Sequence, residues 1–168
     1  MGAFELNSQQ VDESLPGHIL AEDIIALENI PSVPTTNVDG YALHSNQQPG
    51  NYAVVTSATH PISHRLDIGT VMQVNTGSPI PYGTDAVIMV EDTQLESSKP
   101  GSEEEDTITT LKSSTRGDHV RQPGSDVRKG EKVLELGELI EYSGGEMGTL
   151  AFVGRAKVRP ALPHVIPR

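Results

Sequence analysis

The sequence of 168 residues contains no cysteine and no tryptophan, and only six of its residues are phenylalanine or tyrosine. The absence of cysteine excludes disulfides, thiolate metal ligands and cysteine nucleophiles. Hydrophobic residues make up 35% of the chain, and the scarcity of aromatics leaves the core to valine, isoleucine, leucine and alanine. This composition favours strands and thin layers over a thick helical bundle.

Basic residues and long apolar runs are also in short supply. There are 12 lysines and arginines against 23 acidic residues, which gives a formal net charge of -11. An acid excess argues against nucleic acid as a partner, because phosphate binding needs a clustered basic face. No apolar run approaches the roughly 20 residues of a membrane helix, and the first residues lack a signal-peptide pattern. We therefore expect a cytoplasmic protein without membrane insertion.

Glycine and proline are plentiful, with 16 and 12 copies, and they separate short runs of strand-forming residues. Residues 17–26 read as a strand, or as a short helix leading into one. The later runs predict strands at residues 52–56, 70–74, 86–90, 107–111 and 132–136. Short strands with glycine and proline turns are typical of a β-barrel or a curled sheet.

One helix is predicted late in the chain. Ser143 is a candidate N-cap, Glu146 follows it at the spacing of a capping box, and Gly154 suits the position after the last turn. Residues 155–168 contain three prolines, which predicts an extended tail without a further strand after residue 158. Residues 96–106 form an acidic low-complexity stretch, which predicts a solvated, mobile hairpin loop.

Three polar loops could carry chemistry. In residues 37–42, Gly40 permits a positive φ that would point Asp39 out of a turn. In the next loop, the hydroxyl of Thr76 and the backbone N–H groups at Gly77 suit an oxyanion or a phosphate. Residues 121–130 place cations and one carboxylate in a turn before a strand. For each loop taken alone, an ordinary turn is the more common interpretation, so the residue types alone predict a β-rich acidic domain and no particular reaction.

Taken in order, these loops resemble the N-terminal part of the molybdenum insertases, the family of bacterial MoeA and of the E domains of a plant insertase and gephyrin. Residues 17–23 resemble the pattern GR-LAxDV, and residues 37–42, NVDGYA, resemble xxxDGYA. Residues 76–92 are similar to TGAPxPxGADAVVxxED, and residues 119–127 to xIRxxGxDI. The late helix resembles one that ends in LASxG. The resemblance runs from residue 17 to about residue 158.

The resemblance implies a molybdopterin molybdotransferase, which inserts molybdate into adenylylated molybdopterin and releases AMP with the help of Mg²⁺. It also implies a homodimer, in which the second subdomain of one protomer faces the third subdomain of its partner across the active cleft. Carried over by motif, Asp39 and Asp126 are the catalytic carboxylates and magnesium ligands. Thr76, Gly77 and Arg121 are the substrate-binding residues, Arg121 because a guanidinium pairs well with an oxyanion.

The implied fold is mainly β with one or two short helices, in which a curled, barrel-like β lobe is inserted into a smaller mixed lobe. Residues 47–127 would form the β lobe, resembling subdomain II, and residues 1–46 and 128–168 the elongated lobe, resembling subdomain I. We expect the molybdopterin-binding subdomain III to be absent from this chain, so that the chain alone does not catalyse insertion. The alternative is a non-catalytic, gephyrin-like scaffold or protein-binding module.

Overall fold

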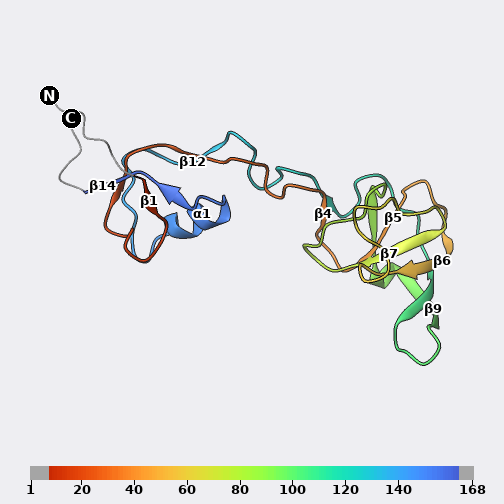
Figure 1. Ribbon diagram of the computed structural model, residues 1–168. Coiled ribbons are helices and arrows are strands. Elements are labelled where there is room, and N and C mark those ends of the chain that lie inside the picture. Colours follow the sequence, from red (N-terminus) through yellow and green to blue (C-terminus); the bar gives the residue numbers. More distant parts are fainter. Residues whose placement is uncertain (1–7, 163–168) are drawn as a thin grey trace. The chain divides into compact units, whose positions relative to one another are not determined.

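The computed structural model describes residues 8–162, and the chain divides into two compact units (Figure 1). The first unit is made of residues 1–32 and 124–168, and the second of residues 33–123. The second unit is therefore an insertion within the sequence of the first. Among the described residues, no helix is long and apolar enough to cross a membrane.

The first unit is held by three antiparallel pairs of very short strands. Each pair joins a strand from before the insertion to a strand from after it, namely β1 (Gln9–Gln10) with β13 (Lys157–Val158), β2 (Ile19–Leu20) with β14 (Pro160–Ala161), and β3 (Ile24–Ile25) with β12 (Lys132–Leu134). Aliphatic side chains from both segments form one core, made of Leu15, Leu20, Ile24, Ala26, Leu134, Ile140, Leu150, Val153 and Val158. The core of this unit therefore forms only when the segment before the insertion packs against the segment after it.

The predicted late helix is present as α1 (Glu146–Phe152), but its start differs from the prediction. The N-cap is Gly145, which makes no side-chain capping bond, so Ser143 is not the cap. The end agrees with the prediction: Gly154 has φ +69°, its N–H donates to the carbonyl of Ala151, and the next N–H donates to the carbonyl of Leu150. These two bonds form a Schellman motif, which explains the glycine.

The prediction of an extended tail without a strand after residue 158 is wrong for the part that the structure describes. Strand β14 contains Pro160, which pairs with Leu20 of β2. A proline is tolerated there because the two-residue strand has a single neighbour and needs few N–H donors. The rest of the predicted tail, residues 163–168, lies outside the described residues.

The second unit is built around a six-stranded sheet in the order β8-β5-β7-β6-β10-β9. Neighbouring strands are antiparallel except β6 and β7, which are parallel. The elements of this unit are β4 (Thr35–Thr36), β5 (Gly40–Leu43), β6 (Gly50–Val55), β7 (Thr70–Val74), β8 (Ala86–Met89), the 3-10 helix η1 (Val90–Asp92), β9 (Thr93–Ser98), β10 (Glu105–Thr110) and β11 (Val120–Arg121).

The middle strands of the sheet are buried on both faces, because their successive side chains point in opposite directions into two different apolar clusters. In β5, Tyr41 and Leu43 join one apolar cluster, whereas Ala42 joins another. In β7 the same alternation sends Val71 to the first cluster and Met72 to the second. The predicted mainly β fold with a curled sheet and one short α-helix is confirmed.

Strand β5 was not predicted, because its residues were interpreted as a tight polar loop. It lies inside the sheet, with β8 on one side and β7 on the other. For this reason the contacts group residues 33–46 with the sheet unit, which starts before the β lobe expected at residue 47. Gly40 also differs from the prediction. Its φ is not positive, and the need for glycine comes from a close approach to the carbonyl of Ile88.

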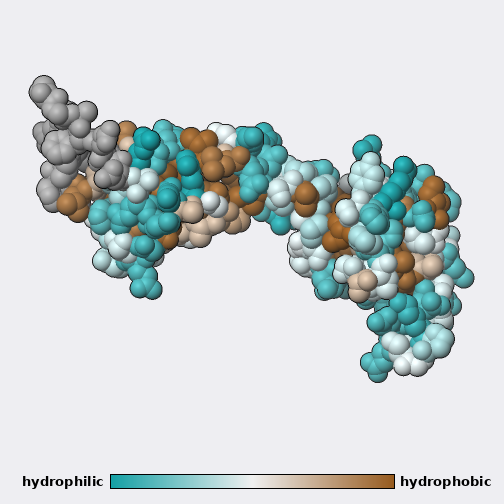
Figure 2. Space-filling model, viewed as in Figure 1, coloured by the Kyte–Doolittle hydropathy of each residue, from teal (hydrophilic) through white to brown (hydrophobic). Residues whose placement is uncertain are grey.

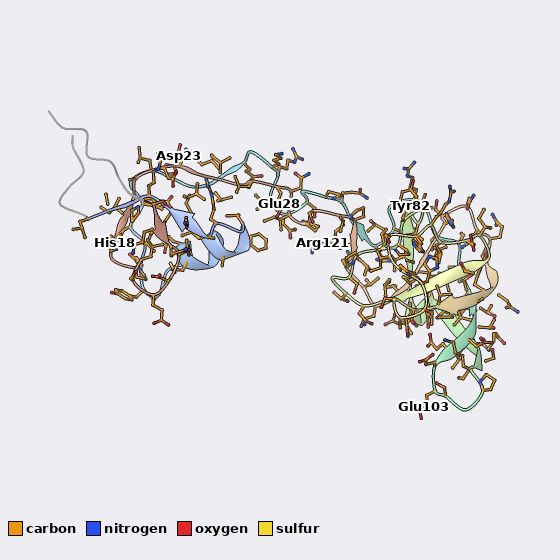
Figure 3. The ribbon with its side chains drawn as sticks, in the orientation of Figure 1. His18, Asp23, Glu28, Tyr82, Glu103 and Arg121 are labelled. Carbon is orange, nitrogen blue, oxygen red and sulfur yellow. The ribbon has the colours of Figure 1, made fainter. Side chains whose placement is uncertain are left out.

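The acidic stretch at residues 96–106 is a hairpin, but its first part is strand rather than loop. Strand β9 continues to Ser98, and the tip is closed by Lys99, whose Nζ lies 2.8 Å from an oxygen of Glu104. Glu103 lies at the tip (Figure 3), and hydrophilic residues cover this part of the surface (Figure 2). At the base, the hydroxyl of Tyr41 donates to Glu105 Oε2 over 2.7 Å, which fixes the hairpin to the sheet.

We predict that Gly40→Ala strongly destabilises the sheet unit. An ideal Cβ at this position would lie 2.0 Å from the carbonyl oxygen of Ile88 and 2.9 Å from its carbonyl carbon. Both atoms belong to the backbone of β8, which cannot move without breaking the ladder. Urea unfolding followed by tyrosine fluorescence should show a loss of about 3 kcal/mol or more.

The matched control is Gly50→Ala at the start of β6. A Cβ at Gly50 has no neighbour within 4 Å and its φ is not positive, so this variant should gain about 0.5 kcal/mol. Equal stability losses in the two variants would show that the close approach at Gly40 is unimportant.

Candidate functional site

Four of the five predicted site residues are connected through the two-residue strand β4. On one side, β4 pairs with β11, so that Thr35 lies opposite Arg121. On the other side, the N–H of Thr36 donates to the carbonyl of Ser78 over 3.0 Å, and the N–H of Gly77 donates to the carbonyl of Thr36 over 2.8 Å. Three loops that are far apart in the sequence thus meet at β4.

The carboxylate of Asp39 is held by Thr76. Its Oδ1 accepts the backbone N–H of Thr76 over 2.7 Å and the hydroxyl of Thr76 over 2.9 Å. Asp39 immediately precedes β5, and Thr76 follows β7 by two residues. Since β5 and β7 are paired with Gly40 opposite Val74, the bond between the two side chains extends this ladder beyond its last backbone pair.

The two donors of Thr76 favour the ionised form of Asp39 and hold it in one orientation. The backbone N–H and then the hydroxyl lower the pKa of the Asp39 carboxyl below its ordinary value of 3.8, although the side chain is exposed. A carboxyl with a lower pKa in the folded state stabilises the fold above its ordinary pKa. That contribution is lost as the pH falls through the folded-state pKa. At neutral pH the site therefore presents a fixed, oriented negative charge.

The backbone N–H groups of Gly77 and Ser78 already donate hydrogen bonds to carbonyls of the protein. The N–H of Gly77 binds Thr36, and the N–H of Ser78 donates to the carbonyl of Asn75 over 2.9 Å. Gly77 has φ +85° with open space where a Cβ would lie, so glycine is needed there for the backbone conformation. The side chain of Thr76, bound to Asp39, is an exposed polar group of this turn. A role of Gly77 in substrate binding stays a prediction.

Arg121 and Asp126 belong to different units. Arg121 is half-buried on β11 of the sheet unit (Figure 3). Asp126 is exposed in the first unit, where its N–H donates to the carbonyl of Ile30 over 2.9 Å. Their predicted roles stay predictions, and the structure describes each of them within its own unit.

The sequence analysis missed the two threonines of β4. Thr36 is 0% exposed, and its hydroxyl donates to the carbonyl of Val38 over 2.8 Å and accepts the N–H of Val38 over 3.1 Å. Thr35 is 6% exposed, and its buried hydroxyl has no hydrogen-bond partner. A threonine two residues before a turn is a known signal for a side-chain-to-backbone bond, and this signal was available.

Within residues 8–162, no group of three or more histidine or acidic side chains is arranged to hold a metal ion. The rings of His60 and His64 meet edge to face with their centroids 6.2 Å apart, and His60 Nε2 lies 3.3 Å from the carbonyl of His64. Asp39 and Asp126 therefore belong to no such three-ligand cluster in the part of the chain that the structure describes.

We predict that Thr76→Val raises the pKa of Asp39 only part of the way to 3.8. The variant removes the hydroxyl donor but keeps the backbone N–H, which makes the larger contribution to the lowered pKa. A carbon-detected NMR titration of the aspartate carboxyls measures this directly. Thr76→Ser keeps both donors and should leave the pKa of Asp39 unchanged.

Two other aspartates provide internal references in the same titration. Hydrogen bonds from Ser14 lower the pKa of Asp12, and those from Thr115 lower the pKa of Asp118. Neither should move in the Thr76 variants. If the pKa of Asp39 in Thr76→Val equals that of the unaltered protein, the hydroxyl bond has no role in holding the charge.

Comparison with known proteins identifies the family of this region. Residues 3–154 match the family described as the MoeA N-terminal region, domains I and II. The molybdopterin molybdenumtransferase of Staphylococcus epidermidis is 34% identical over 160 residues, covering 90% of this chain and 36% of the relative. The enzyme of that name from Haemophilus influenzae is 34% identical over 145 residues, covering 84% and 34%. Gephyrin of Dictyostelium discoideum is 28% identical over 179 residues, covering 96% and 24%.

Solved structures agree with the sequence comparison. Two crystal structures of the molybdopterin biosynthesis MoeA protein of Pyrococcus horikoshii match with TM-scores of 0.75 and 0.70 and sequence identities of 26% and 29%. They cover 90% and 91% of this chain, and the chain covers 38% and 40% of theirs. The chain spans about a third of the length of the curated bacterial relatives. It belongs to the MoeA family, of which it carries the N-terminal region with domains I and II.

Proposed function

We propose that this chain is the N-terminal part of a molybdopterin molybdotransferase and supplies one wall of the cleft in which molybdate is inserted into adenylylated molybdopterin. The observation that carries the proposal is the Asp39–Thr76 pair, an oriented and ionised carboxylate on the sheet unit of a chain from this family. The substrates are inferred from the names and the chemistry of the relatives.

The negative charge of Asp39 favours contact with a cation or a hydrogen-bond donor rather than directly with an anionic group of the substrate. Asp39 is ionised at neutral pH, and both the N–H and the hydroxyl of Thr76 already bind it, so a bare phosphate oxygen would be repelled. Asp39 suits a hydrogen-bond donor of the substrate or a cation that bridges to its phosphates. Arg121, on the neighbouring strand β11, is the cationic side chain that we assign to an oxyanion of the substrate.

Magnesium fits this arrangement, because Mg²⁺ is commonly held by one or two carboxylates together with substrate phosphates rather than by a cage of protein ligands. We assign Asp39 as the carboxylate of the sheet unit that would hold it. Asp126, in the first unit, stays a separate candidate ligand. When bound, such an ion stabilises the negative charge that develops as a phosphoanhydride bond breaks. The part of Thr76 is to hold the Asp39 carboxylate in a fixed orientation.

The chain by itself should not release AMP from adenylylated molybdopterin, because it spans about a third of the length of its enzyme relatives. We predict that activity returns when residues 1–154 replace the matching region of the Staphylococcus epidermidis enzyme. AMP release in the presence of molybdate and magnesium is the measurement. In this fusion, Asp39→Asn should lower the rate about 100-fold or more, as expected for the loss of an electrostatic contact at a reacting centre.

Glu103→Gln is the control for the loss of one negative charge, since Glu103 lies at the exposed tip of the β9–β10 hairpin (Figure 3). It should leave the rate of the fusion unchanged. A fast rate of AMP release by the unfused chain, or full activity of the Asp39→Asn fusion, would contradict the proposed function.

Assembly and location are further parts of the proposal. A homodimer is supported by large exposed apolar side chains in the first unit, where Leu136, Tyr142 and Phe152 are 63%, 85% and 53% exposed. Sedimentation equilibrium of the chain tests this directly. The cytoplasmic location stays a prediction from the composition.

A gephyrin-like scaffold or protein-binding module is the second candidate. It is favoured by the similarity to Dictyostelium discoideum gephyrin, which extends over 96% of this chain. The Asp39→Asn change separates the two functions, because a scaffold needs a folded surface rather than one ionised carboxylate. If this variant keeps a partner bound but abolishes AMP release in the fusion, both functions are present.

A further inference from the structure

We propose that Thr36 is the positioning residue that brings Asp39 and Thr76 together. Thr36 is fully buried and contacts both loops, one through its side chain and the other through its main chain. The inference deepens the proposed function, because its consequence for catalysis rests on the role of Asp39. Its structural part stands on the geometry alone.

The side chain of Thr36 fixes the loop that carries Asp39. Its hydroxyl donates to the carbonyl of Val38 and also accepts the N–H of Val38, so both polar backbone groups of that residue are bound. Val38 is the residue directly before Asp39. These two bonds close a tight turn over residues 36–38 and set the direction in which the next residue leaves it.

The main chain of Thr36 fixes the loop that carries Thr76. Its carbonyl accepts the N–H of Gly77 over 2.8 Å, and its N–H donates to the carbonyl of Ser78 over 3.0 Å. Through these bonds the turn after β7 pairs with β4 in the way a short strand would. Because one buried residue holds both loops, it fixes the positions of the two groups that form the 2.7 Å bond between Asp39 Oδ1 and the N–H of Thr76.

Thr35 provides a natural comparison within the same strand. It is also buried and has the same side chain, but its hydroxyl makes no hydrogen bond. The isosteric change from threonine to valine therefore removes two side-chain bonds at Thr36 and none at Thr35. A general effect of altering a buried threonine in β4 should appear in both variants, whereas a positioning effect should appear only at Thr36.

The test is amide hydrogen exchange of the chain, measured by NMR for Thr76 and Gly77. In Thr36→Val, exchange of the Thr76 N–H should become about tenfold faster, because its acceptor Asp39 is no longer aligned. The Gly77 N–H donates to the main chain of Thr36, which the variant keeps, so its exchange should change less than about threefold. Thr36→Ser retains the hydroxyl and should restore slow exchange at Thr76, and Thr35→Val should leave both amides as they are.

Three results would overturn the proposal: unchanged exchange at Thr76 in Thr36→Val, equal acceleration at Gly77, or the same acceleration in Thr35→Val. If Thr36→Val does not fold, faster exchange at Thr76 in Thr36→Ser would overturn the proposal, since that variant keeps the hydroxyl and loses only the methyl group.

The fusion enzyme then tests the consequence for the proposed function. Thr36→Val should lower kcat about tenfold with little change in KM, and Thr36→Ser should restore it. If the unaltered fusion releases no AMP, the proposed function fails, whereas the exchange data still decide the positioning role of Thr36. If the exchange data support positioning but kcat does not change, the Asp39–Thr76 bond has no part in the rate.

Discussion

The packing of β5 against its two neighbours is the constraint on which the sheet unit and its candidate site depend. Its first residue is Gly40, whose missing side chain leaves room for the carbonyl of Ile88 on β8. On the other edge β5 pairs with β7, which brings the residues before β5 and after β7 to the same end of the ladder. Asp39 and Thr76 stand at that end, so the site is a direct product of the strand order.

The orientation and the ionisation of the exposed Asp39 carboxylate depend on the residues that surround it. Asp39 is open to solvent, yet two donors from Thr76 hold one of its oxygens and favour the ionised form. The donors come from one residue, and the turn that carries this residue is tied to β4 by backbone bonds. The result is a charge that is fixed in direction at little cost in burial, which suits contact with a cation or with a polar group of a substrate.

Much of the fold could be predicted, because the strands that read as β-branched runs are the strands that form. The run at residues 70–74 coincides with β7, and the end of the late helix at Gly154 follows from its Schellman bonds. Strand β5 could not be predicted, because it is only four residues long and follows Asp39 directly, so that Asp39-Gly40 resembles a turn. Pairing across the insertion could not be predicted either, since β2 and β14 are only two residues long and too short to show a pattern in the sequence.

The sequence by itself determined the composition of the core, the order of the loops, the family and the presence of Asp39 and Thr76 in two of those loops. These are local or linear properties, and residue types and spacing are enough to read them. Only the tertiary structure decided that the N–H and hydroxyl of Thr76 bind Asp39. It also decided that Gly40 is required by the nearby carbonyl of Ile88, and that Thr36 binds both loops. Each of these depends on a contact between segments whose meeting is fixed by strand order and register, which the linear spacing of residues does not contain.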